Sequence, residues 1–494
     1  MNRIVSWLGL VLSGSCVSGA MKANRLSPGD ASVYDALPLA DTAEDSFLAR
    51  DSAEDGLQAR DSDIDVPSAA VQVDARIDSS LFAPCPLALS GPPLPVAFAR
   101  GAMGRGFTLL DPGDLHTSPP RPVHVALHAW VDHPDDAAIE VADLHVPATW
   151  PSAIDLDHPS VVVGPAAHSD TIAAVTGNRE TLILTYHGHP LGFPGGLELV
   201  PVDVATWTAG AIIQVSEGQW ASPRGLASGA GMGVGASFAG QGFGIGWSVI
   251  APDAGEDELR AAVIRNDGTI GAGPWLLSAV GGDTQLWTDV AWSGTTYLFA
   301  RTSNTCAPVD PLCRPSSVTI TRVANDTEAA TLQLASTFPA PGGACCAAIA
   351  SYGGSAWAVW FENASTDGSS ASNVRLVQLD SSGVALQAPV TIASATPAIS
   401  LVEIAASRIG VLVAWMERNV DRSRVQLHQF GPDGAELDTA TSIDVPLYSN
   451  YPDINLAAVE NPPGMLVGWA AGIEGDRSDP ASTTWLARME CGQP

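Results

Sequence analysis

The pattern of apolar and polar positions is clearest between 409 and 437, IGVLVAWMERNVDRSRVQLHQFGPDGAEL. An apolar run ends at Trp415, a charged stretch follows, and polar and apolar positions then alternate over 424–430. A run that is apolar on both sides is typical of a central strand, whereas alternation is typical of a strand with one exposed face. Asp433-Gly434 supplies the dihedral angles that a hairpin turn needs. The stretch therefore predicts a strand, a loop, a second strand and a turn.

This arrangement recurs along the chain every 53 to 61 residues. Each unit has a Gly- or Ala-rich strand, an apolar strand ending at an anchor residue, a polar loop, an alternating strand, a turn and a short fourth strand. Repeats of this length with four strands predict the blades of a β-propeller. The anchor residues are Tyr186, Trp247, Ala300, Trp360, Trp415 and Trp469.

The units resemble the repeats of secreted bacterial propeller lipoproteins, whose blades have the signature VVW(D/E)xR…RV…DG. The best match runs from Ala414-Trp415-Met416-Glu417-Arg418 through Val425 to Asp433-Gly434, and the unit with Trp360-Phe361-Glu362 is next. Ala300 departs from the signature, although Tyr297 and Phe299 supply aromatic bulk beside it. The resemblance implies the fold, and it implies little about function because propellers have many activities.

Seven second strands can be placed, which predicts an all-β chain with a single propeller of seven four-stranded blades. The chain ends after the third strand of the last unit, and the short apolar run 86–89 belongs to no unit. We expect this run to complete the last blade and close the ring, because an open blade would leave an exposed sheet edge. In the first unit, VHVALHAW is interpreted as a third strand, with a second strand of a shifted frame as the alternative. The second strands are expected at 107–110, 182–186, 243–247, 297–300, 357–360, 412–415 and 466–469.

Six cysteines lie in the folded region, and an even number in an exported chain favours disulfides. Cys85 begins the closing strand and Cys491 ends the strand beside it, so a bond between them would clamp the ring. A disulfide between Cys306 and Cys313 would cross-link a surface loop. Cys345 and Cys346 are adjacent, and both a strained vicinal bridge and two buried thiols remain open.

The N-terminus has the features of an export signal, with Arg3 followed by an apolar core at 4–12. Leu12-Ser13-Gly14-Ser15-Cys16 resembles a bacterial lipobox, which implies lipidation of Cys16 within a signal of residues 1–20. Cleavage after Ala20 is the alternative. Residues 21–82 are acidic, contain a tandem decapeptide and have few large apolar residues, so we expect a disordered linker before a propeller domain at 83–494.

The net charge of the chain limits the classes of molecule that it is expected to bind. Acidic residues number 53 against 23 basic ones, for a net charge of −30. Nucleic acid is excluded as a partner because phosphate binding needs a basic surface. We expect a monomer without a cofactor, which contacts membrane only through a lipid anchor. An outer-membrane lipoprotein is favoured over a periplasmic or secreted protein.

The long connections between second and third strands are the expected place for a ligand, because variable loops on a rigid scaffold commonly bind. No residue is assigned as catalytic or metal-binding, since His187 and His189 lack a third ligand and the common hydrolase motifs are absent. The first hypothesis is a protein that binds a glycan or an envelope protein. The alternative is a carbohydrate-active hydrolase or lyase using a ring of carboxylates at the channel mouth. The candidate residues on the loop face are Arg301, Glu362, Glu417, Arg418, Asp476 and Arg477.

Overall fold

A computed structural model describes the fold of the chain. Among the residues it describes there is no helix with the length and hydropathy of a membrane span. The predicted signal, Cys16 and the predicted linker at 21–82 lie outside the described residues. The described residues are 83–96, 103–110, 123–131, 138–146, 161–165, 173–177, 181–187, 197–203, 206, 208–215, 220–229, 242–250, 256–265, 267, 269–281, 287–305, 314–324, 331–340, 344–363, 372–395, 398–418, 423–437, 441–445, 454–460, 463–471 and 483–491.

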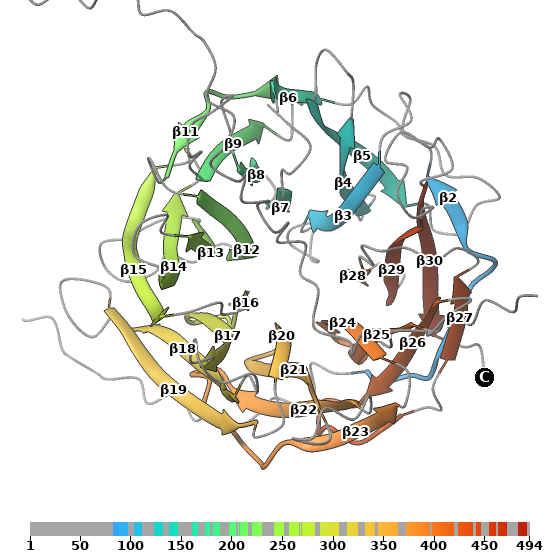
Figure 1. Ribbon diagram of the computed structural model, residues 1–494. Helices are drawn as coiled ribbons and strands as arrows, with labels where there is room; N and C mark the ends of the chain where they lie inside the picture. The colour runs from blue at the N-terminus through green and yellow to red at the C-terminus, as the bar shows by residue number, and fades with distance from the viewer. Residues whose placement is uncertain are drawn as a thin grey trace, which may run out of the picture. The chain divides into compact units, whose positions relative to one another are not determined.

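The described strands form seven sheets, and each sheet is one blade of a β-propeller (Figure 1). All pairings within them are antiparallel. Blade 1 contains β3 (Met103–Leu110), β4 (Val123–Val131), β5 (Ala138–Val146) and β6 (Val161–Pro165). Blade 2 contains β7 (Ala173–Gly177), β8 (Thr181–His187) and β9 (Leu197–Asp203), with β10 (Thr208–Ala209) and β11 (Ile213–Gln214) both paired to β9. Blade 3 contains β12 (Trp220–Gly229), β13 (Gly242–Ile250), β14 (Glu256–Arg265) and β15 (Ile270–Gly281).

The remaining four sheets follow the same plan. Blade 4 contains β16 (Trp287–Trp292), β17 (Tyr297–Thr305), β18 (Arg314–Ala324) and β19 (Thr331–Pro339). Blade 5 contains β20 (Ala344–Tyr352), β21 (Ser355–Asn363), β22 (Ser372–Asp380) and β23 (Val390–Ala395). Blade 6 contains β24 (Ala398–Ser407), β25 (Gly410–Arg418), β26 (Ser423–Phe430) and β27 (Thr441–Val445). Blade 7 contains β28 (Ile454–Glu460), β29 (Pro463–Ala471), β30 (Thr483–Cys491), β1 (Leu87–Leu89) and β2 (Leu94–Val96).

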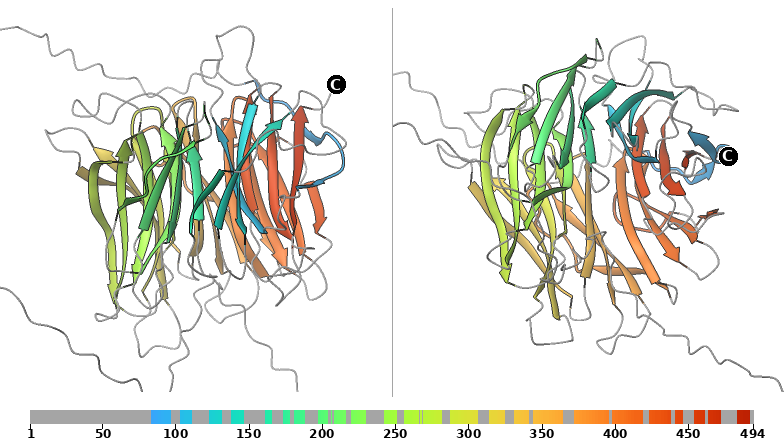
Figure 2. Two further views of the ribbon diagram at one scale, coloured as in Figure 1. Left: turned by 90° about the horizontal axis from the view of Figure 1, so that it is seen from above. Right: turned by 45° about the horizontal axis from the view of Figure 1, so that its top comes forward.

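The first strand of each blade lies innermost, and successive first strands contact one another around the ring (Figure 1). Seen from the side, neighbouring blades stand against each other face to face (Figure 2). A strand in the middle of a blade is therefore covered on both sides, which explains why the second strands are apolar runs. The second strands of blades 2 to 7 lie where the sequence predicts them.

Blade 1 differs from the sequence prediction by one strand. Residues 107–110 belong to β3, which is the first strand, and VHVALHAW forms β4, the second strand. The preferred frame was therefore wrong, and the shifted frame describes the blade. The error arose because β3 and β4 each contain a largely apolar stretch, and periodicity alone does not distinguish an inner first strand from the second strand beside it.

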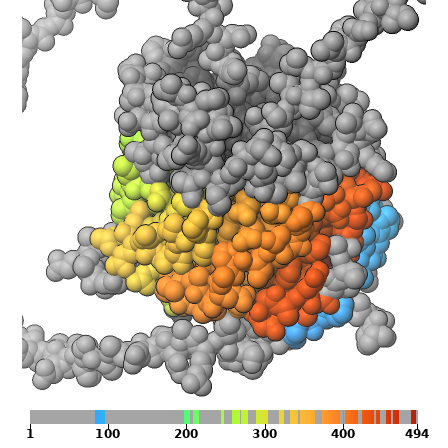
Figure 3. All heavy atoms as spheres, turned by 60° about the horizontal axis from the view of Figure 1, so that its bottom comes forward, coloured from blue at the N-terminus to red at the C-terminus, as the bar shows by residue number. Residues whose placement is uncertain are grey.

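The N-terminal segment closes the ring, as the sequence predicts. Leu87 lies opposite Cys491 and Leu89 lies opposite Met489 in the β1–β30 pairing. The unforeseen strand β2 pairs with the other half of β30, where Leu94 lies opposite Leu486. The segment lies on the outside of the molecule against blades 6 and 7 (Figure 3). Together the two short strands cover the edge that β30 would otherwise expose.

The repeated tryptophan packs against the preceding blade. Trp360 of blade 5 stacks on Phe338 of blade 4 with ring centroids 5.5 Å apart, and Trp247 of blade 3 lies in one buried cluster with Leu197 and Leu199 of blade 2. These indoles are almost fully buried. Burial of such a ring stabilises by roughly 3 kcal/mol or more. The anchor position of the repeat is thus an inter-blade wedge.

Blade 4 fills this position with a different residue from the one the spacing predicts. Ala300 packs with Trp360 and therefore faces the following blade, whereas Tyr297 and Phe299 pack with Leu259 of the preceding blade. Side chains alternate along a strand, so Arg301 is the residue that faces blade 3 at the wedge position. The prediction of Ala300 was wrong by one residue, because the number of residues after the turn sets the wedge position. Arg301 lies five residues after Thr296, which is bonded to Ser293 across the turn. Trp360 and Trp415 lie equally far after Ser355 and Gly410.

Candidate functional site

Four of the predicted loop residues lie within strands. Arg301 belongs to β17, Glu362 to β21, and Glu417 with Arg418 to β25. The second strands therefore run further than the first charged residue suggests. All second strands occupy the same place in their sheets, so their last residues gather at one end of the ring. Asp476, Arg477 and the connections at 306–313, 364–371, 419–422 and 472–482 lie outside the described residues.

Glu417 is held by its own blade. The Trp415 indole donates its Nε1–H to Glu417 Oε1 at 3.3 Å, and Gln426 Nε2 donates to Glu417 Oε2 at 3.0 Å. Trp415 and Glu417 are two residues apart, so both side chains leave the strand on the same side. The recurring Trp-x-Glu pattern thus has a structural cause here, because the carboxylate satisfies an indole N–H buried between blades.

Glu362 is also engaged within its own blade, but its partner is an arginine and not the tryptophan of the repeat. Its Oε1 lies 3.5 Å from Arg375 Nε on the neighbouring strand β22, and the Arg375 guanidinium also donates to Thr391 on β23. Both carboxylates lie on second strands, one strand outside the innermost layer. Glu362 and Glu417 therefore do not form the ring of carboxylates at the channel that the alternative function would use, because each is paired within its own blade.

Arg301 lies between two blades. Its Nη1 donates to the backbone carbonyl of Leu277 in β15, and burial lowers the pKa of its guanidinium without making it neutral. Arg301 thus satisfies a carbonyl of blade 3 at the position where other blades place an indole. Arg418 ends β25 opposite Ser423 of β26.

Asp289 is the residue that sequence reasoning missed. It lies on the innermost strand β16, opposite Ala300 of β17, and its Oδ2 accepts a hydrogen bond from the backbone N–H of Ile349 at 2.8 Å. Ile349 belongs to β20, the innermost strand of the next blade. The carboxyl group therefore joins two blades at the inner edge. A single acid in the apolar first strand WTDVAW was the available signal.

The environment of Asp289 changes its protonation. Burial raises the pKa of its carboxyl group to about 7, against the lowering effect of hydrogen bonds from the backbone of Ile349 and Val290. A carboxyl with a pKa near neutrality can donate or accept a proton under physiological conditions. The raised pKa of Asp289 therefore suits its carboxyl group to acid–base chemistry, although its contacts also give it a structural role.

A histidine lies close to the Glu417 site. The ring of His428 on β26 lies 4.7 Å from that of Trp415, and its Nδ1 lies 3.2 Å from Glu436 Oε1. Burial lowers the pKa of His428, and the nearby Glu436 and Glu417 carboxylates act in the opposite direction. Within the described part of the chain, no three His, Cys, Asp or Glu side chains gather as metal ligands would.

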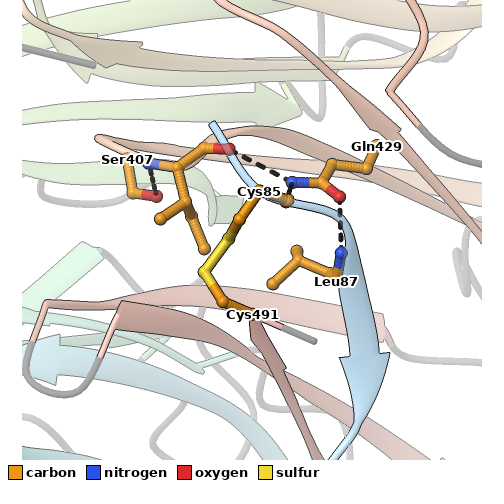
Figure 4. Close-up of a disulfide and its surroundings, with 6 residues drawn as sticks. Cys85, Leu87, Ser407, Gln429 and Cys491 are labelled. Atoms are coloured by element: carbon orange, nitrogen blue, oxygen red, sulfur yellow. Dashed lines mark hydrogen bonds between the residues drawn. A yellow bond between two sulfur atoms is a disulfide. The ribbon is translucent and has the colours of Figure 1, made fainter. Parts of the chain in front are cut away.

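The ring closure carries a disulfide between Cys85 and Cys491, whose Cα atoms are 5.5 Å apart (Figure 4). Gln429 of blade 6 fixes the same segment, because its Nε2 donates to Cys85 O at 2.7 Å and its Oε1 accepts from Leu87 N at 2.9 Å. Cys346 is a buried thiol with φ of 58° at a bulge in β20. Cys306 and Cys313 lie outside the described residues.

Comparison with known proteins gives similar folds at low identity. No family model matches the chain, and no curated protein matches it. Among solved structures, an α-L-arabinanase from Penicillium chrysogenum is 12% identical, with a TM-score of 0.44 over 63% of this chain and 90% of that one. An α-L-arabinofuranosidase from Fusarium graminearum is 12% identical, with a TM-score of 0.43 over 62% and 89%. The WD40 domain of SCAP from fission yeast is 8% identical, with a TM-score of 0.37 over 84% and 99%.

Proposed function

We propose that the protein is an exported, lipid-anchored β-propeller that binds a glycan or another protein at the bacterial cell envelope. The observation that carries this proposal is the engagement of Glu362 and Glu417 within their own blades, at the ends of the strands that precede the second-to-third connections in sequence. These contacts fix the ends of the second strands in blades 5 and 6, from which the connections start. A rigid base with connections of different length and sequence is the usual arrangement of a recognition surface.

The location rests on two features. The Cys85–Cys491 bond favours an oxidising compartment, where disulfides persist. The lipobox-like residues up to Cys16 favour an anchor in the outer membrane. Labelled palmitate should attach to the wild-type protein and not to the Cys16→Ala variant, which should leave the membrane fraction. Equal labelling of both proteins would reject the anchor and leave the alternative cleavage after Ala20.

Ligand binding is tested on the full folded chain. A glycan array and cross-linking in intact envelopes would identify the ligand, and each connection would then be replaced in turn by Gly-Ser residues of equal length. Replacement of 364–371 or 419–422 should weaken capture at least about tenfold, the range expected when contacts central to an interface are lost. A matched control replaces the turn residues Ser381 and Ser382, which lie between the third and fourth strands. Equal loss in the control would contradict binding through the second-to-third end.

A carbohydrate-active hydrolase or lyase is the second candidate, and Asp289 is the observation that favours it. A carboxyl group with a pKa near 7 is suited to serve as a general acid. The array should therefore be read for turnover as well as binding. Turnover that is abolished by Asp289→Asn, with the fold intact, would establish this candidate, whereas binding without turnover would establish the first.

A further inference from the structure

The ring closure lacks the peptide turn that joins the third and fourth strands in blades 5 and 6. In blade 5 the turn at 380–383 is closed by Gly383 N donating to Asp380 O at 3.0 Å. In blade 6, Gly434 N donates to Gly431 O at the same distance. In blade 7 the third strand ends at Cys491 and the closing strand follows Cys85, so the disulfide makes the only covalent link between these strand ends.

The surroundings of the disulfide match those of a turn. Gln378 of blade 5 donates to Pro432 O in the turn of blade 6 at 2.6 Å. Gln429, one blade further, donates to Cys85 O at 2.7 Å. The two glutamines lie opposite Trp357 and Leu412, at matching positions of their second strands. The same glutamine hydrogen bond that holds a peptide turn in blade 6 therefore holds the disulfide-bonded segment in blade 7.

Few non-covalent contacts attach the closing strand β1 to the rest of the ring. β1 pairs with β30 through three residues, of which only Leu87 is buried, whereas Ala88 and Leu89 are exposed. Besides Gln429, the segment is held by hydrogen bonds from Ala83 N to Arg408 O and from Ser90 N to Arg488 O. A three-residue strand with one buried side chain is at the low end of local stability. The disulfide is thus the dominant restraint on β1.

We propose that the Cys85–Cys491 bond is a redox lock: β1 detaches from the ring under reducing conditions and closes it in an oxidising compartment. On closure, one thiolate of the pair attacks a sulfur of a disulfide-bearing oxidant and displaces that oxidant's other sulfur as a thiolate. The second thiolate of the pair then attacks the mixed disulfide and forms the Cys85–Cys491 bond. The oxidant leaves as a dithiol, and the two protons come from the protein thiols.

The position of β1 near the N-terminus suggests when the disulfide would form. β1 is the first strand of the propeller, and only the predicted linker at 21–82 separates it from the predicted export signal. A chain made in a reducing compartment would keep this end free until export. β2 is closer in sequence to blade 1 and has its own pairing with β30, so reduction should release β1 more than β2.

Hydrogen exchange of the full chain with and without reductant tests the lock. In the reduced wild type, amides of 87–89 should exchange at least about tenfold faster, whereas those around Trp357 and Trp415 should keep their rates. A Cys85→Ser/Cys491→Ser variant should exchange rapidly in β1 under both conditions. The Cys306→Ser/Cys313→Ser variant retains the closing pair and should respond to reductant as the wild type does.

Two outcomes would overturn the proposal. Unchanged exchange at 87–89 after complete reduction, verified by alkylation of both thiols, would mean that the non-covalent contacts hold β1 alone. Acceleration of equal size in all blades would mean that the bond supports the whole ring and does not lock one strand. Both readings come from the reduced wild type, so the test stands even if the double-serine variant does not fold.

Discussion

Blades 4 and 6 solve the same packing problem with opposite chemistry. Blade 6 inserts Trp415 toward the preceding blade and satisfies the indole with Glu417. Blade 4 places Arg301 there, which donates to Leu277 O, and obtains its apolar bulk from Tyr297 and Phe299. The comparison teaches that the repeat requires a side chain that fills the space and satisfies polar groups between blades. It does not require a particular residue.

The largest expected effect is a difference in unfolding free energy between variants of Trp415 and of Arg301, the residues at the wedge position in blades 6 and 4. Trp415→Ala should lower the unfolding free energy by about 3–5 kcal/mol, because it leaves a cavity between blades. Arg301→Met keeps the aliphatic stem and loses the hydrogen bond to Leu277 O, so about 1–2 kcal/mol is expected. Denaturant unfolding measures both, with exposed Val384→Ala as the control, expected within about 0.5 kcal/mol of wild type. Equal losses at Trp415 and Arg301 would contradict the comparison.

The next effect concerns the inner edge of blade 4. The folded-state pKa of Asp289 is raised to about 7 from an ordinary value of 3.8, so the folded state holds a proton that the unfolded state releases. The contribution of Asp289 to stability should therefore be fully present below about pH 4 and fall by about 2–4 kcal/mol as pH rises to 7. Asp289→Asn keeps the oxygen that accepts from Ile349 N and removes this dependence.

The control for the pH experiment is Asp444→Asn, which alters an exposed carboxylate paired with Arg424 and should leave the pH profile near wild type. Thermal unfolding between pH 4 and 8 is the measurement. A wild-type profile that rises over this interval, and that Asp289→Asn leaves unchanged, would show that Asp289 ionises normally.

A smaller effect concerns the close contact between Gly244 of blade 3 and Tyr297 of blade 4. A Cβ added at Gly244 would lie 2.6 Å from Tyr297 Cδ1, because this strand of blade 3 lacks the side chain that Leu412 provides in blade 6. Gly244→Ala should cost about 1–3 kcal/mol through overpacking. Adding Tyr297→Leu should recover part of this cost in a double-mutant cycle. Additive losses would show that the tyrosine does not set the spacing.

The smallest effects concern the two carboxylates. Glu417→Gln should cost about 1 kcal/mol through weaker hydrogen bonds to Trp415 and Gln426. Glu362→Gln should cost about 0.5 kcal/mol, because its partner Arg375 is partly exposed. Neither change should alter ligand capture in the array. Loss of capture without loss of stability would mean that these two residues contact the ligand.

Much of the fold could be predicted because its signals are local. Apolar runs and turn residues located six second strands, and the missing last strand pointed to closure by the N-terminal run. The site could not be predicted as well. Which face of a strand meets which blade depends on the exact number of residues after the turn, and an error of one residue placed Ala300 instead of Arg301 at the wedge position. The pKa of Asp289 depends on an N–H from another blade, 60 residues away in sequence.

Non-reducing peptide mapping tests the central claim, that the N-terminal segment completes blade 7 and is bonded to its last strand. The protein should be alkylated before digestion so that thiols do not exchange. We predict one linked peptide pair that joins Cys85 to Cys491. A bond from Cys85 to Cys306, Cys313, Cys345 or Cys346, or an alkylated Cys85 in the oxidised protein, would contradict the closure.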